Sequence, residues 1–180
     1  MDQLLPVPIV IALITFVVAC CAVDVRIRRI PNAISAPAIL AGLLLNTWYF
    51  GMNGLLASTG GVVVMGAVLI APFALGGIGA GDVKMMAAVG AFLGPRLAAF
   101  GLALGMALGG VIMGVHLLRI GRFREKIGAL QLMISSAILM RSTHPLRVAA
   151  ENPGAISLPY SVPLALGTAA AVAAASAFGR

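Results

Sequence analysis

The sequence predicts an all-α polytopic membrane protein of about six transmembrane helices. Hydrophobic residues make up 61% of the chain and charged residues only 9%, and the mean hydropathy is +1.10. Soluble globular domains carry far more charge than this. Apolar stretches long enough to cross a bilayer recur along the chain, separated by glycine-rich or basic breaks. These observations predict a single membrane-embedded domain over residues 1–180.

Each predicted span is an apolar run that ends at a polar, basic or glycine-rich break. A run of about 20 apolar residues is long enough to cross the hydrocarbon core. The predicted spans are residues 4–23, 34–50, 55–75, about 82–93, 97–118 and 158–178. The breaks between them are residues 26–32, 51–54, 76–81, 94–96 and 119–157.

The fourth predicted span, residues 82–93, is too short to cross a membrane alone. It would rise ~18 Å as a helix, against a hydrocarbon core of ~30 Å. Either the glycine-rich stretch 76–81 enters the bilayer, or this helix is buried among the others where the membrane is thinned. Irregular backbone at membrane depth is tolerated inside protein or beside a water-filled cavity, and hydrolysis near a membrane would need such a cavity.

The last break, residues 119–157, is the one sizeable segment predicted outside the membrane, and it is basic. Within it, residues 127–140 are apolar and flanked by basic residues. This pattern predicts an interfacial helix on the cytoplasmic leaflet, with a short re-entrant segment as the alternative.

Basic residues are concentrated on one side of this topology. Ten of the twelve Lys and Arg residues follow the first, third or fifth span, whereas only Arg96 and Arg180 fall on the other side. Cytoplasmic loops carry an excess of Lys and Arg, so we expect both termini outside and the three basic loops in the cytoplasm. The same rule accounts for the net charge of +7 without nucleic-acid binding.

Two aspartates, Asp24 and Asp82, lie at predicted membrane boundaries on this cytoplasmic side. An ionisable side chain near the hydrocarbon is costly and by default indicates a functional site. Two carboxyl groups within a few ångströms hold one proton between them near neutral pH. The ionised group can then activate a water while the protonated group donates to a scissile carbonyl. The pair therefore predicts metal-independent hydrolysis of a peptide bond.

Structural and non-hydrolytic roles are alternatives for these acids. Asp24 could cap a helix or pair with Arg28 or Arg29, and Asp82 could pair with Lys84. A small proton- or ion-linked transporter would also use intramembrane carboxylates. Such a transporter should show an inverted repeat and an acid near the bilayer midplane, and the sequence shows neither. A non-catalytic scaffold gives no reason for two costly carboxylates.

No metal or other cofactor is predicted. Cys20 and Cys21 are adjacent within an apolar run, and His116 and His144 lie far apart without a metal-ligand spacing. In the fifth span, the small-xxx-small steps Gly101, Gly105 and Gly109 predict a helix–helix contact instead of a site.

Three segments resemble motifs of the type IV prepilin peptidases. Asp24-Val25-Arg26-Ile27-Arg28-Arg29-Ile30-Pro31-Asn32 resembles their first-aspartate motif. Gly79-Ala80-Gly81-Asp82-Val83-Lys84 resembles their glycine-x-glycine-aspartate motif, and Leu158-Pro159-Tyr160-Ser161-Val162-Pro163 looks like their proline-aromatic segment. The three segments occur in the family's order over roughly residues 20 to 170.

The resemblance implies an aspartic endopeptidase with Asp24 and Asp82 as its catalytic pair. The substrate-binding or site-supporting residues that it implies are Gly79, Gly81, Lys84, Pro31, Asn32 and Pro159. The enzyme would cut the basic leader from prepilin or pseudopilin precursors at the cytoplasmic face of the bacterial inner membrane. Its expected partners are these precursors and the lipid bilayer, with no nucleic acid.

The compact length distinguishes this chain from the long members of the family. It lacks their extra cytoplasmic insertion with paired CxxC motifs, so N-methylation of the cleaved pilin is not expected. The compact form looks most like the peptidases of tight-adherence (Flp-type) pilus systems.

Overall fold

A computed structural model describes residues 5–27, 29–74, 78–121 and 160–178, and within these ranges all regular structure is helical. The helices are α1 (Val7–Ile27), α2 (Asn32–Ala74), α3 (Ala80–Arg119) and α6 (Ser161–Phe178). The predicted all-α fold is therefore confirmed. Helices α1, α2 and α3 are long and apolar enough to cross a membrane, and α6 is apolar but shorter. The predicted interfacial segment 127–140 lies outside the described residues.

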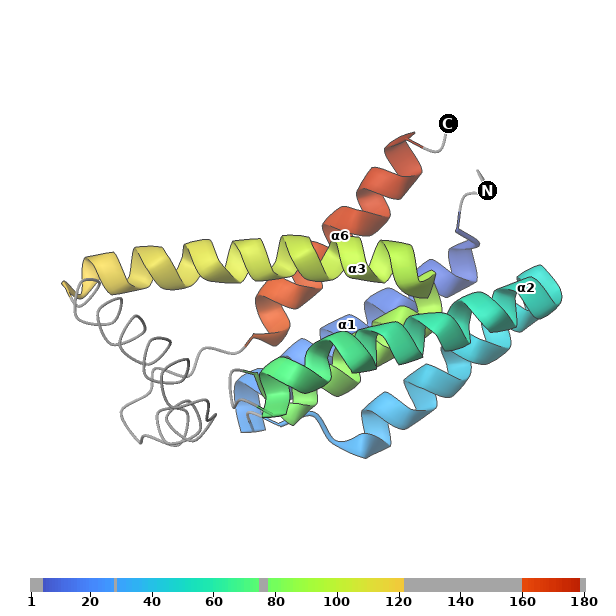
Figure 1. Ribbon diagram of the computed structural model, residues 1–180, viewed down its shortest axis with the longest axis horizontal. Helices are drawn as coiled ribbons and strands as arrows, with labels where there is room; N and C mark the ends of the chain where they lie inside the picture. Colours follow the sequence, from blue (N-terminus) through green and yellow to red (C-terminus); the bar gives the residue numbers. More distant parts are fainter. Residues whose placement is uncertain (1–4, 28, 75–77, 122–159, 179–180) are drawn as a thin grey trace, which may run out of the picture.

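Helices α2 and α3 each consist of two arms joined at a glycine, where the chain doubles back (Figure 1). Gly51 has φ 61° and Gly94 has φ 72°, left-handed values that a residue with a Cβ adopts only with strain. Pro95 then starts the second arm of α3, where its missing N–H costs nothing. A straight helix as long as α2 would measure ~65 Å, twice the hydrocarbon core, whereas each of the two arms of α2 roughly matches the core.

The arms correspond to the predicted spans, but the predicted breaks are too long. The break predicted at 51–54 is a turn at Gly51, and the break at 94–96 is a turn at Gly94. Helix α1 continues to Ile27, so Asp24 lies within a helix instead of after it. Hydropathy marks the apolar part of a helix, whereas backbone hydrogen bonding extends the helix into flanking polar residues. Six membrane crossings remain a prediction.

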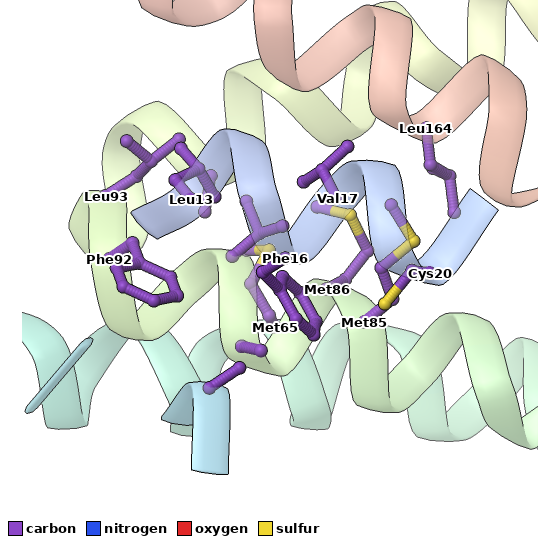
Figure 2. Close-up of a cluster of buried hydrophobic side chains, with 14 of the residues drawn as sticks. Leu13, Phe16, Val17, Cys20, Met65, Met85, Met86, Phe92, Leu93 and Leu164 are labelled. Carbon is purple, nitrogen blue, oxygen red and sulfur yellow. The ribbon is translucent and has the colours of Figure 1, made fainter. Parts of the chain in front are cut away.

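The first arm of α3 occupies the centre of the bundle. Met85, Met86, Val89 and Phe92 are each at most 1% exposed, and they belong to one hydrophobic cluster with α1 residues such as Phe16 (Figure 2). The ring centroids of Phe16 and Phe92 are 6.4 Å apart. Of the two explanations offered for the short fourth span, burial among other helices is the one that the described residues support.

Helices α2 and α3 approach each other backbone to backbone. A Cβ added at Gly61 would collide with the carbonyl group of Gly90, and one added at Gly42 would lie 2.8 Å from the Cβ of Ala91. Glycine at these positions therefore allows the central arm to lie directly against both arms of α2.

Two polar side chains of α2 donate hydrogen bonds to the backbone carbonyl groups at the end of the first arm of α3. The Nδ2 atom of Asn46 donates to the carbonyl oxygens of Ala91 and Phe92 at 3.0 Å, and Ser58 Oγ donates to that of Ala91 at 2.6 Å. The last carbonyls of a helix have no partner within the helix. Asn46 and Ser58 thus stabilise the break at Gly94 inside the protein.

The second arm of α3 contacts α6 through its glycines, as predicted. A Cβ at Gly105 would lie 2.8 Å from Leu164 Cα, and one at Gly101 would lie 3.2 Å from Thr168 Cα. This contact fixes the start of α6 beside α3. The beginning of α1 and the end of α6 lie towards one end of the bundle, whereas the end of α1 and the beginning of α6 lie towards the other (Figure 1).

Candidate active site

Asp24 is a buried carboxyl group in the last turn of α1. Only 9% of the residue is exposed. Its Oδ2 atom accepts a hydrogen bond of 2.6 Å from Ser161 Oγ, and Ser161, the first residue of α6, is fully buried. A short hydroxyl-to-carboxylate bond is among the stronger hydrogen bonds in proteins. The start of α6 therefore holds the Asp24 side chain in a defined orientation.

Asp82 is a buried carboxyl group in the first turn of α3 and is also 9% exposed. Its Oδ2 atom accepts the backbone N–H of Gly79 at 3.3 Å. Gly79 is extended, with φ −76° and ψ 150°, and precedes the helix as its N-cap residue. Asp82 thus contributes to capping α3, and this bond fixes the side chain relative to the loop before it.

The two aspartate motifs lie against each other. Ile30, in the loop after α1, contacts the first turn of α3, because a Cβ added at Gly81 would lie 3.2 Å from the Ile30 backbone nitrogen. Asp24 also accepts a hydrogen bond from Ser161, and Tyr160, the residue before Ser161, lines a pocket together with Asp82. The described residues therefore bring together two acids that are 58 positions apart in the sequence.

A pocket of about 280 Å³ opens beside Asp82. We call it the Asp82 pocket. It lies between the second arm of α2, the start and the second arm of α3, and the start of α6. Its lining includes Leu69, Ile78, Asp82, Leu102, Tyr160 and Leu164. Apart from Asp82 and the Tyr160 hydroxyl, these side chains are apolar.

The remaining predicted site residues have more peripheral positions. Lys84 is half-buried, and no ion pair joins it to Asp82 within the described part of the chain. Asn32 is exposed and begins α2, whereas the first turn of that helix bonds to the carbonyl oxygen of Pro31. Pro159 lies outside the described residues.

The ion pairs considered for Asp24 are not found among the described residues. Among the described residues, Arg26 and Arg29 are exposed and neither forms an ion pair with Asp24. Arg28 lies outside the described residues. The bond that Asp24 does make, from Ser161, was not predicted. The one sequence signal for it was a hydroxyl residue beside Tyr160 at the start of a mostly apolar span.

The fold and the site define a helical membrane protein with two buried carboxyl groups at one end of its bundle. No group of three or more His, Cys, Asp or Glu side chains among the described residues is placed to hold a metal ion. A model of the type IV leader peptidase family matches residues 11–114, more than half of the chain. The protein therefore belongs to this family.

The matched region contains both aspartate motifs and ends before α6. Comparisons with curated proteins and with solved structures gave no match. Membership of the family makes the chain a leader peptidase, a hydrolase that acts on type IV prepilins in a membrane. It does not favour the ion transporter that the sequence had left as an alternative.

Proposed function

We propose that this protein is an aspartic endopeptidase that removes the basic leader from type IV prepilin-like precursors, with Asp24 and Asp82 as the catalytic pair. The observation that carries the proposal is that both carboxyl groups are buried in segments that pack together, since Ile30, six residues after Asp24, lies against Gly81, the residue before Asp82. Burying acids costs free energy, and such groups are concentrated at functional sites. Membership of the leader peptidase family gives the reaction class.

The chemistry follows from one proton shared by the pair. The ionised carboxylate takes a proton from a water, whose oxygen attacks the carbonyl carbon of the scissile peptide bond. The protonated carboxyl group donates its proton to the carbonyl oxygen, giving a tetrahedral intermediate. Collapse of this intermediate breaks the C–N bond as the leaving nitrogen accepts a proton. Ser161 and the Gly79 N–H keep the two carboxyl groups oriented for these transfers.

We further propose that the site faces the cytoplasm of a bacterial inner membrane. Arg26 and Arg29 follow Asp24 and are exposed, and Arg119 ends α3. Basic residues at that end of the helices support this orientation. The cysteines are limited to the adjacent Cys20 and Cys21. The lack of paired CxxC motifs supports cleavage without N-methylation, in a tight-adherence (Flp-type) pilus system.

Replacing either carboxyl group tests the proposal directly. Asp24→Asn and Asp82→Asn should each reduce processing of a co-expressed type IV prepilin by at least roughly a thousandfold, because a single carboxyl group cannot act as both acid and base. Processing is measured on an immunoblot from the ratio of the cleaved band to the uncut precursor band.

Glu125→Gln is the matched control, because it neutralises an acid that lies outside both motifs. It should process the precursor at the wild-type rate. Each variant must also reach wild-type abundance in the membrane fraction. Full processing by Asp24→Asn or by Asp82→Asn would show that the pair is not the catalytic centre.

A further inference from the structure

The Asp82 pocket is a mostly apolar cavity with a candidate catalytic carboxyl group in its wall. Of the described residues that line it, Asp82 is the one that can carry a charge. Its volume of about 280 Å³ is several times the ~30 Å³ that one water occupies in the liquid. The pocket therefore has room for one large side chain. Polar water molecules would find few partners deep in it, since the lining there consists of residues such as Leu69 and Leu102.

The position of the cut bond limits what this pocket can hold. At the cytoplasmic face, the leader lies in water while the chain that follows the leader enters the bilayer. A side chain on the membrane side of the cut is therefore in an apolar environment before it reaches the enzyme. A peptide bond placed against Asp82 brings the next side chain within reach of the pocket in whose wall Asp82 lies.

We propose that the Asp82 pocket is a specificity pocket, which receives a large apolar side chain from the precursor residue immediately after the cleavage site. This inference rests on the proposed endopeptidase activity. Burial of that side chain against Leu102, Met106 and Leu164 removes apolar surface from contact with water or lipid headgroups and places the preceding carbonyl beside Asp82.

Gly110 is a position in the pocket wall where a larger side chain can be introduced. It lines the pocket from the second arm of α3, and a Cβ added there meets nothing within 4 Å. A larger side chain at Gly110 therefore has space at its Cβ in the wall of the cavity. Gly114 is one turn further along the same arm, and a Cβ there also meets nothing within 4 Å, but Gly114 does not line the pocket.

The experiment compares two forms of one type IV prepilin, with Leu or Ala as the first residue after the cleavage site. Wild-type enzyme should process the Leu form roughly tenfold faster than the Ala form. Gly110→Leu should lower the ratio of the Leu-form rate to the Ala-form rate roughly tenfold, which removes the preference. The matched control, Gly114→Leu, should keep the wild-type preference.

The ratio of the two rates within one variant is the readout, so a general loss of folded enzyme cancels. Met106→Ala, which widens the pocket from the same arm, is a second variant and should shift the preference towards a Trp form of the precursor. An unchanged ratio in both Gly110→Leu and Met106→Ala, or no wild-type preference between Leu and Ala, would overturn the pocket assignment. Failure of wild-type enzyme to cut either form would instead overturn the proposed function, and this inference with it.

Discussion

At the scale of single residues, Asp24 depends on a partner that is 137 positions away in the sequence. Asp24 is in the last turn of α1, where the helix dipole disfavours a negative charge, whereas the first turn of a helix such as α6 favours one. Ser161 adds a hydroxyl donor at that point. The start of α6 thus offsets an unfavourable position in α1 and orients the carboxyl group.

Ser161 should act as a positioning residue in the proposed reaction. Ser161→Ala is expected to lower kcat by roughly tenfold to a hundredfold and to change KM little, because a hydrogen bond to a charged group contributes ~1.5–3 kcal/mol. Ser161→Thr restores a hydroxyl and should recover part of the rate. Both constants are measured with purified enzyme in detergent and a type IV prepilin.

Ser58→Ala is the control for this prediction. Ser58 also donates a buried hydrogen bond of 2.6 Å, but to the carbonyl oxygen of Ala91 near the break in α3. It should reduce stability to a similar extent while leaving kcat unchanged. Equal losses of kcat in the Ser161 and Ser58 variants would assign the Ser161 effect to folding alone.

The sequence marks the two aspartates of the site much more clearly than it marks the serine that bonds to one of them. Asp24 and Asp82 could be selected from the sequence because a carboxyl group is costly near hydrocarbon. A serine in an apolar helix costs little, since its hydroxyl can bond within its own helix. A hydroxyl residue at the start of an apolar span is therefore a weak signal, and the role of Ser161 depends on where α6 begins relative to α1.

At the scale of helices, the close contact between α2 and α3 depends on Gly61 and Gly90. Gly61→Ala should destabilise the protein by ~1–3 kcal/mol, because the added Cβ would overlap the Gly90 carbonyl and push the helices apart. Gly60→Ala is the matched control. An added Cβ at Gly60 meets nothing within 4 Å, so alanine's higher helix propensity should leave stability unchanged or slightly increased.

Thermal unfolding of both variants in detergent measures this difference. Equal melting temperatures for Gly61→Ala and Gly60→Ala would contradict a backbone contact at Gly61. The sequence did not predict this contact, because Gly60 and Gly61 are identical residues in the same helix. Only the packing partner, Gly90 on another helix, distinguishes them.

The described helices were largely predictable, since apolar runs and glycine breaks give their approximate ends. The geometry of the breaks was not. Residues 51–54 contain two glycines, and only Gly51 has a positive φ. Gly54 is instead buried within the second arm of α2, where an added Cβ would collide with the Asn46 carbonyl. Hydropathy cannot separate a glycine required by a turn from a glycine required by packing.

At the scale of the whole molecule, both aspartates must face the same compartment for the proposed reaction. Reporter fusions after Arg29 and after Gly81 should therefore report a cytoplasmic location, and fusions near Asn53 and at Arg180 should report the outside. The distribution of Lys and Arg leads to this expectation independently of the catalytic assignment. Opposite locations for the Arg29 and Gly81 fusions would exclude a shared proton.

The short first arm of α3 also bears on how deep the carboxyl groups lie. It rises only ~21 Å between Ala80 and the turn at Gly94. In a hydrocarbon core of ~30 Å whose outer boundary is level with Gly94, Asp82 would lie ~12 Å inside the inner boundary. A precursor would then have to draw its cleavage site below the headgroups while its charged leader stayed in water. The depth of the site would thereby fix how many uncharged residues separate the last leader charge from the cut.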